Sequence, residues 1–178
     1  MPAAQFAYRK SLGYTDALLA ISHHLQKFLD AGIESYIVQL DFSAAFDRVS
    51  ESGLSFKLKY IGVGGSLLSI CTEFFPNSRQ RVMVDGAVSE WIPIISGVPQ
   101  GSVLSPLLFV LYTSEMFRLV ENRLFAYADD STLLAVVSKP ADRPAVAASL
   151  NDLARIQEWC NHWCTMLNSD KTKALVVS

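Results

Sequence analysis

Residues 123–137 read RLFAYADDSTLLAVV, and this stretch decides the fold. Two apolar runs flank a pair of aspartates, which is the pattern of two strands joined by a tight turn. We therefore predict an antiparallel hairpin with strands over residues 123–128 and 131–137 and with Asp129 and Asp130 at its tip. Two adjacent aspartates are also ordinary turn formers, because Asp tolerates turn geometry and its side chain bonds nearby backbone donors.

A second apolar run also ends on a carboxylate. Residues 35–41, SYIVQLD, predict a buried strand that ends at Asp41. A carboxylate beside buried backbone is costly unless something neutralises its charge. If this strand lies beside the hairpin, Asp41, Asp129 and Asp130 converge. When carboxylates lie so near to one another, all of them are ionised only if cations lie among them.

Three carboxylates without a nearby His or Cys favour hard divalent cations such as Mg²⁺. Paired metal ions activate an attacking oxygen and stabilise a leaving oxygen during phosphoryl displacement. Polymerases, nucleases and phosphatases all use this chemistry. The spacing of the carboxylates alone therefore does not separate these three classes of enzyme.

The rest of the chain predicts helices interleaved with a second hairpin. Asp85-Gly86 between two apolar runs is a strong hairpin signal within residues 79–95. Thr15 or Asp16 is expected to cap the first helix. Apolar periodicity and turn residues predict helices over residues 15–30, 50–61, 66–75 and 141–167, a helix from Ser105, and a strand over 174–177. This order predicts an α+β fold with helices packed on one face of an antiparallel sheet.

Composition limits the classes of protein that the chain can be. Its 178 residues, 51% of them hydrophobic, suit one globular domain with a real core. Lys and Arg number 15 against 17 Asp and Glu, so the chain lacks the basic excess of a typical nucleic-acid binder. No secretory signal and no apolar stretch near the ~20 residues of a membrane span is visible. With three cysteines, we expect an intracellular protein of the cytoplasm or nucleus without membrane association.

Five segments in this order resemble motifs of reverse transcriptases, and they are most similar to those of non-LTR (LINE-like) retroelements. The segments are QFAYRKSLGYTDALL (5–19), similar to a fingers segment; LDFSAAFDRV (40–49), similar to the first catalytic segment; SGVPQGSVLSPLLF (96–109), similar to the PQG box; FAYADDSTLL (125–134), similar to the YxDD box; and MLNSDKTKALVVS (166–178), similar to the lysine-bearing segment. Together they span nearly the whole chain.

The resemblance implies an RNA-directed DNA polymerase palm that extends a primer by two-metal-ion nucleotidyl transfer. It assigns Asp41 and Asp129 to two catalytic Mg²⁺ ions, with Mn²⁺ as an alternative metal, and it makes Asp130 the third carboxylate of the metal site. Lys171 matches a lysine that protonates the departing pyrophosphate. The alternative for Lys171 is an exposed charge near a helix end.

The resemblance also assigns residues that meet the nucleotide and the primer. Phe46 matches the aromatic beneath the sugar, where a rigid ring collides with a 2′-hydroxyl; the alternative is a core aromatic. Gln100 and Gly101 match residues that approach the nucleotide and the template pair. Arg9 matches an arginine expected to meet the triphosphate, although a lone Arg near a terminus also fits a solvated surface. Tyr127 is expected beneath the primer end, or else as a half-buried strand aromatic.

The family pattern further implies a domain organisation and a set of partners. Residues 1–35 match the end of the fingers and residues 36–178 match the palm, with fingers elements inserted around 50–95 and no thumb. The implied partners are an RNA template, a DNA primer, deoxynucleoside triphosphates, and the missing fingers, thumb and endonuclease parts of the same polyprotein. We expect the fragment to be inactive alone. The alternative is a non-catalytic remnant or nucleic-acid-binding module with a palm fold.

The near-neutral net charge also bears on how strongly the chain binds nucleic acid. Two bound divalent cations would change the formal charge of −2 to about +2. Basic surfaces elsewhere in a polymerase supply most of the affinity for phosphate. We therefore expect this chain alone to bind nucleic acid weakly and in a salt-sensitive way.

Overall fold

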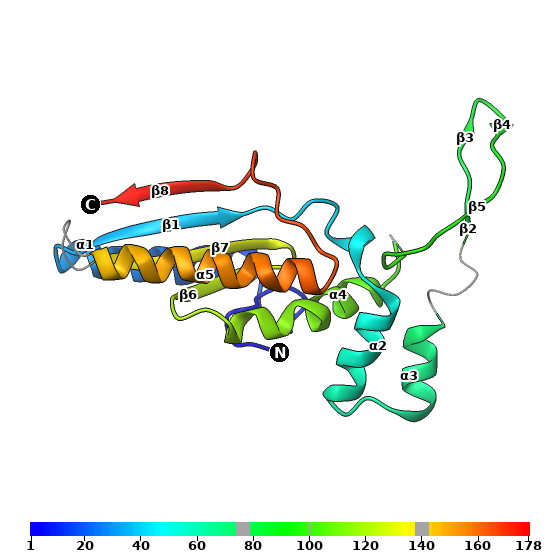
Figure 1. The fold of residues 1–178 in the computed structure, drawn as a ribbon, viewed down its shortest axis with the longest axis horizontal. Coiled ribbons are helices and arrows are strands. Elements are labelled where there is room, and N and C mark those ends of the chain that lie inside the picture. Colours follow the sequence, from blue (N-terminus) through cyan, green and yellow to red (C-terminus); the bar gives the residue numbers. More distant parts are fainter. Residues whose placement is uncertain (74–78, 100, 138–142) are drawn as a thin grey trace. The chain divides into compact units, whose positions relative to one another are not determined.

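The computed structural model describes residues 1–73, 79–99, 101–137 and 143–178 (Figure 1). The chain forms two compact units, which are described separately below. The first unit contains Met1–Ala45 and Thr113–Ser178, and the second contains Phe46–Tyr112. Gln100, one of the predicted nucleotide-binding residues, lies outside the described residues.

A four-stranded antiparallel sheet forms the centre of the first unit, with strand order β6-β7-β1-β8. Its strands are β1 (Glu34–Leu40), β6 (Arg123–Tyr127), β7 (Asp130–Val137) and β8 (Lys173–Val177). Strands β6 and β7 form the predicted hairpin, because Tyr127 pairs with Asp130 across a two-residue turn. Strand β1 pairs along its full length with β7, from Glu34 opposite Val137 to Leu40 opposite Ser131. The sheet and its helices confirm the predicted α+β fold.

Two long helices pack against this sheet. Helix α1 (Tyr14–Asp30) contacts β6 and β1, and helix α5 (Arg143–His162) contacts β7. The predicted cap of α1 was wrong: Gly13 is the N-cap residue, and its backbone N–H donates to the Asp16 carboxylate at 2.7 Å. None of the described helices is long and apolar enough to cross a membrane.

Helix α5 is shorter than the apolar periodicity predicts. It ends at His162 rather than near residue 167. Cys164 adopts a left-handed backbone with φ 57°, and the Thr165 N–H donates back to the Cys160 carbonyl at 2.9 Å. A left-handed residue just past the end is a common way to terminate a helix. The apolar residues beyond the helix therefore belong to a loop that leads toward β8.

A buried aspartate on α5 fixes the start of β6. Asp152 is fully buried, and its carboxylate accepts backbone N–H bonds from Glu121 and Asn122 at 2.9 Å each. The Asn122 side chain and the Arg155 guanidinium donate two further bonds, at 2.8 and 3.0 Å. Because every lone pair has a donor, this buried charge is stabilised rather than isolated. The turn η2 (Ser114–Arg118) precedes this connection.

The second unit contains short helices and two small hairpins. Its elements are η1 (Phe46–Arg48), α2 (Glu51–Tyr60), α3 (Gly65–Thr72), β2 (Arg79–Gln80) paired with β5 (Ile92–Pro93), β3 (Met83–Val84) paired with β4 (Ala87–Val88), and most of α4 (Ser105–Thr113). Asp85 and Gly86 form the predicted turn, with φ of 49° and 83°. Two positive φ values are what a two-residue hairpin turn requires. The predicted hairpin and helices of this unit are therefore confirmed, although α3 ends at Thr72 and residues 74–75 of its predicted range lie outside the described residues.

Candidate active site

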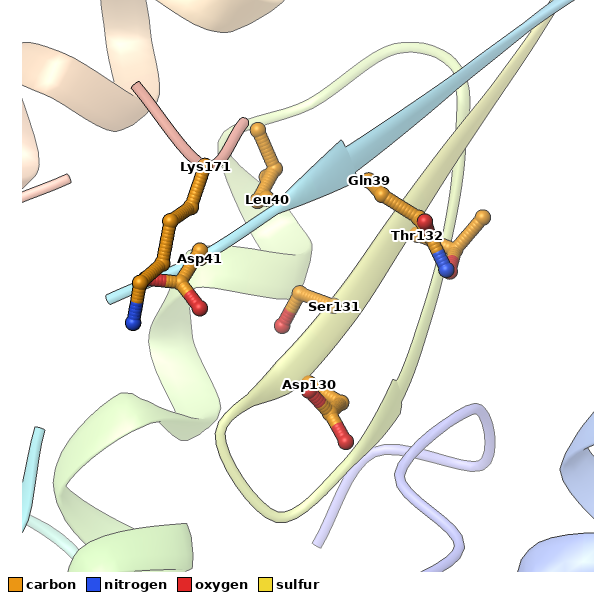
Figure 2. Close-up of a pocket in the computed structure, with 7 residues that line it drawn as sticks. All are labelled: Gln39, Leu40, Asp41, Asp130, Ser131, Thr132 and Lys171. Atoms are coloured by element: carbon orange, nitrogen blue, oxygen red, sulfur yellow. The ribbon is translucent and has the colours of Figure 1, made fainter. Parts of the chain in front are cut away.

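The pairing of β1 with β7 brings two of the three predicted carboxylates to one pocket. Asp41 directly follows β1, and Asp130 is the first residue of β7, beside the register pair Leu40–Ser131. The pocket has a volume of about 120 Å³. It is lined by Gln39, Leu40, Asp41, Asp130, Ser131, Thr132 and Lys171 (Figure 2). The sheet therefore gathers carboxylates that lie about ninety residues apart in the sequence.

The third carboxylate is near enough to act electrostatically. Partial burial of the largely exposed Asp130 side chain raises its pKa most, and the negative charges of Asp129 and then Asp41 raise this pKa further. Asp129 is half-buried in the turn between β6 and β7 and does not line the pocket. Because the charges of Asp129 and Asp41 raise this pKa in addition to burial, the ionised carboxylates repel one another in the folded chain. A bound cation would relieve this repulsion.

Asp130→Asn is expected to raise the thermal stability of the chain at neutral pH in EDTA. A carboxyl group whose pKa is higher in the folded chain than in the unfolded chain stabilises the fold below its unfolded pKa, about pH 3.9. This stabilisation is lost as the pH rises through the pKa of the folded chain. The neutral amide avoids that loss. We expect a rise of at most about 2 °C, because Asp130 is exposed and water screens its charge.

Thermal melts at pH 7 and pH 3.5 would measure this effect. The difference between variant and wild type should shrink at the lower pH. Asp30→Asn is the matched control, because Asp30 is an exposed carboxylate at the end of α1. A variant that melts below wild type at pH 7 would contradict the repulsion.

The lysine-bearing loop after α5 makes two hydrogen bonds to the backbone of Asp41. The Asn168 N–H donates to the Asp41 carbonyl at 2.8 Å, and the Asp41 N–H donates to Thr172 Oγ1 at 3.4 Å. Asn168 Oδ1 accepts the N–H groups of Asp170 and Lys171 at 3.2 Å each. These contacts hold the lysine beside the carboxylate, and both side chains line the same pocket (Figure 2). Sequence reasoning missed Asn168, although Asn followed by Ser and Asp is a recognisable turn signal.

The turn that carries Asp129 has a strained backbone. Ala128 has φ 58°, a left-handed conformation that costs a residue with a Cβ roughly 1–2 kcal/mol. The Gln5 side chain contacts the backbone of this residue, donating to its carbonyl and accepting from its N–H at 3.2 Å each. Gln5 is a second residue that sequence reasoning missed.

Aromatic residues of the N-terminal segment and α1 surround the same turn. The Tyr14 ring meets the half-buried Tyr127 ring edge to face, with centroids 5.5 Å apart. Burial raises the pKa of Tyr8, as do the charge of Asp129 and, less strongly, Tyr127. Asp129, a predicted metal ligand, thus acts electrostatically on Tyr8, a residue that the sequence motifs did not assign to the site.

Arg9 lies elsewhere in the N-terminal segment. Its guanidinium donates to the carbonyls of Pro2, Ala3 and Gln5 at 3.3, 2.9 and 3.3 Å. Arg9 does not line the pocket with Asp41. In this structure it closes the loop of the first residues, and its expected role at the triphosphate remains a prediction.

In the second unit, a close backbone contact positions Phe46. Its ring stacks on Phe109 with centroids 4.5 Å apart and planes 27° from parallel. The Phe46 carbonyl accepts the Val98 N–H at 2.9 Å, and the Val49 carbonyl accepts the Gly97 N–H at 2.9 Å. These bonds hold the loop of the PQG motif beside η1.

Glycine is required at one position of that loop. Gly97 has φ 93°, and a Cβ there would lie 2.7 Å from Asp47 Cα and 2.8 Å from Asp47 O. Gly101 also has a positive φ, 83°, but a Cβ there would meet nothing within 4 Å. The role of Gly101 at the nucleotide remains a prediction.

The carboxylates fit a divalent cation in their chemistry. All the predicted ligand atoms are carboxylate oxygens, which Mg²⁺ and Mn²⁺ prefer. Among the described residues, no group of three or more His, Cys, Asp or Glu side chains is close enough together to hold a metal ion. The assignment of Asp41, Asp129 and Asp130 as metal ligands therefore remains a prediction.

Comparisons with known proteins agree on one family. The family model for "Reverse transcriptase (RNA-dependent DNA polymerase)" matches residues 1–177. The RNA-directed DNA polymerase from mobile element jockey of Drosophila melanogaster is 33% identical over 96% of the chain. The probable RNA-directed DNA polymerase from transposon BS of the same species is 28% identical over 97%. The chain spans 19% and 20% of the lengths of these relatives.

Telomerases are among the solved structures that share this fold. Telomerase from Candida albicans, in complex with the TWJ fragment of telomeric RNA, has a TM-score of 0.67 and 17% identity, covering 98% of the chain and 32% of the telomerase. Apo telomerase from Candida tropicalis, truncated from its C-terminal domain, also has a TM-score of 0.67, with 16% identity, covering 93% and 36%. At such low identity these likenesses establish the fold alone.

Proposed function

Because the chain belongs to the reverse transcriptase (RNA-dependent DNA polymerase) family, we propose that it is the catalytic palm of an RNA-directed DNA polymerase encoded by a non-LTR retroelement. The observation that carries the proposal is the pocket that Asp41, Asp130 and Lys171 line together. Two acids and a lysine at one end of a sheet suit the transfer of a nucleotidyl group to a primer end.

The acids and the lysine have separate proposed roles. Asp41 and Asp129 would hold two divalent cations, and Asp130 would complete the acidic patch. When bound, such cations stabilise negative charge on the attacking and leaving oxygens. Lys171, which lines the same pocket as Asp41, donates a proton from Nζ to the departing pyrophosphate. Asn168 keeps this lysine at the pocket, because its N–H donates to the Asp41 carbonyl and its Oδ1 accepts the Lys171 N–H.

Further residues are proposed to contact the nucleotide and the primer. Phe46, braced by Phe109, excludes a 2′-hydroxyl, while Gln100 and Gly101 approach the nucleotide and the template pair. Tyr127 lies beneath the primer end. For Arg9 to bind the triphosphate, its three bonds to backbone carbonyls would have to be exchanged for phosphate oxygens.

The proposed partners follow from the reaction. They are an RNA template, a DNA primer and deoxynucleoside triphosphates, together with further parts of a longer polypeptide such as an endonuclease and a thumb. The formal charge of −2 supports the view that those parts supply most of the phosphate affinity. Such an activity would operate in the cytoplasm or nucleus.

Primer extension on an RNA template by the full-length protein tests this proposal. With Mg²⁺ or Mn²⁺ we expect extension from deoxynucleotides, and we expect EDTA to stop it. Phe46→Val should raise ribonucleotide incorporation by about 10-fold or more relative to deoxynucleotides, because a smaller side chain leaves room for the 2′-hydroxyl. A full-length wild type that binds template and primer but never extends them would instead favour a non-catalytic palm.

A further inference from the structure

Gln5 is a fully buried polar side chain, only 1% exposed, in the N-terminal segment of the first unit. Its Oε1 accepts the N–H groups of Ala7 and Ala128 at 3.0 and 3.2 Å. Its Nε2 donates to the Ala128 carbonyl at 3.2 Å. One amide side chain therefore satisfies both backbone polar groups of a residue 123 positions away. A buried amide is tolerated only when it is paired in this way.

A short backbone ladder brings Gln5 to this position. The Phe6 N–H donates to the Ala126 carbonyl at 2.9 Å, and the Ala126 N–H donates to the Ala4 carbonyl at 2.9 Å. Gln5 thus pairs with Ala126 as a parallel bridge along β6. The ladder ends where the turn begins, and from there the Gln5 side chain continues the contact to Ala128.

The contacted residue has a backbone conformation that needs support from its surroundings. Ala128 has a left-handed backbone, which alanine adopts only when its surroundings impose it. Asp129 follows directly and Asp130 comes next, so a rotation of the Ala128 peptide would change the direction of both carboxylates. Pairing both polar groups of Ala128 resists that rotation.

We propose that Gln5 is a positioning residue for the carboxylate turn: its amide fixes the strained Ala128 backbone and thereby holds Asp129 and Asp130 in the orientation that nucleotidyl transfer requires. Gln5 does not line the pocket, so it acts through the turn. We call the hydrogen bonds of the Gln5 amide to Ala7 and Ala128 the clamp. The catalytic part of this inference rests on the proposed function, whereas the clamp rests on these contacts alone.

Gln5→Met tests the clamp, because Met has a similar length and lacks all three bonds. We expect amide exchange at Ala128 to become at least 10-fold faster in hydrogen–deuterium exchange of the full-length protein, while exchange at Leu133, in the core of β7, changes far less. Gln157→Met is the control, because Gln157 is exposed on α5 and bonds only Asn161 among the described residues. Equal acceleration at Ala128 and Leu133, or none at Ala128, would overturn the inference.

Steady-state primer extension tests the catalytic consequence. Gln5→Met should lower kcat about 10-fold or more and change KM for the deoxynucleotide less than about 3-fold, because a positioning residue leaves nucleotide binding largely intact. Faster exchange at Ala128 with an unchanged kcat would overturn the catalytic role. If the wild-type protein fails to extend primers, the proposed function is wrong. Amide exchange at Ala128 still shows whether the Gln5 side chain stabilises the backbone of this turn.

Gln5→Glu keeps the inference testable if the Met variant does not fold. A carboxylate retains the two accepted N–H bonds but loses the donation to the Ala128 carbonyl. We expect exchange at Ala128 and kcat to lie between those of wild type and of Gln5→Met. A folded Gln5→Glu that matches wild type in both measurements would contradict the need for a clamp on both polar groups.

Discussion

Asp41→Asn is expected to abolish RNA-templated primer extension, with kcat lower by on the order of 10³-fold. The amide has the shape of the carboxylate but carries no charge, so it is a poor ligand for a divalent cation. The backbone bonds of Asp41 to Asn168 and Thr172 do not involve its side chain, so the variant should fold. Asp129→Asn should have a loss of similar size.

Single-turnover extension by the full-length protein, combined with melting curves, measures this prediction. The melting temperature should stay near that of wild type, which separates lost chemistry from lost folding. Asp30→Asn again serves as the exposed control. Extension at the wild-type rate by Asp41→Asn would rule out its assignment as a metal ligand.

Gly97→Ala is expected to destabilise the second unit by about 3 kcal/mol or more. The new Cβ would meet backbone atoms of Asp47 at 2.7–3.0 Å, and backbone cannot move aside as the end of a flexible side chain can. The left-handed φ adds roughly 1–2 kcal/mol for any residue with a Cβ. If the Gly97 loop moved away from Asp47, the hydrogen bond from the Val98 N–H to the Phe46 carbonyl would also be lost. Primer extension should therefore fall as well.

Gly62→Ala is the matched control for this substitution. Gly62 is in the same unit and has a similar φ, 89° against 93°, but a Cβ there would meet nothing within 4 Å. It should therefore show only the conformational cost of about 1–2 kcal/mol. Urea denaturation of both variants measures the difference. Equal losses would mean that the loop moves away from Asp47 without cost.

Local signals in the sequence predicted most of the fold. Alternating and periodic apolar residues identified the strands of the sheet and the long helices, and Asp85-Gly86 identified a hairpin turn. These signals depend on neighbours within a few positions, so a single chain carries them. The end of α5 was misplaced because apolar residues continue past His162, where a left-handed Cys164 ends the helix.

The candidate site was predictable only in part. The motifs drew attention to Asp41, Asp130 and Lys171, which line one pocket in the structure. Gln5 and Asn168 were missed because each acts through bonds to the backbone of a segment more than 120 positions away. Neither residue type nor spacing reveals such a partner before the chain is folded.

The central position of β1 also has a consequence for the order of synthesis. Leu40 emerges from the ribosome 91 residues before its register partner Ser131, and β8 follows later still. At roughly 5–20 residues per second, this strand waits about 5–18 seconds with both edges unpaired. Its sequence ESYIVQL is rich in residues that favour strands, so the nascent chain has a period of exposure to wrong pairing. Slower translation would lengthen this period, and a chaperone that covers β1 would protect the chain during it.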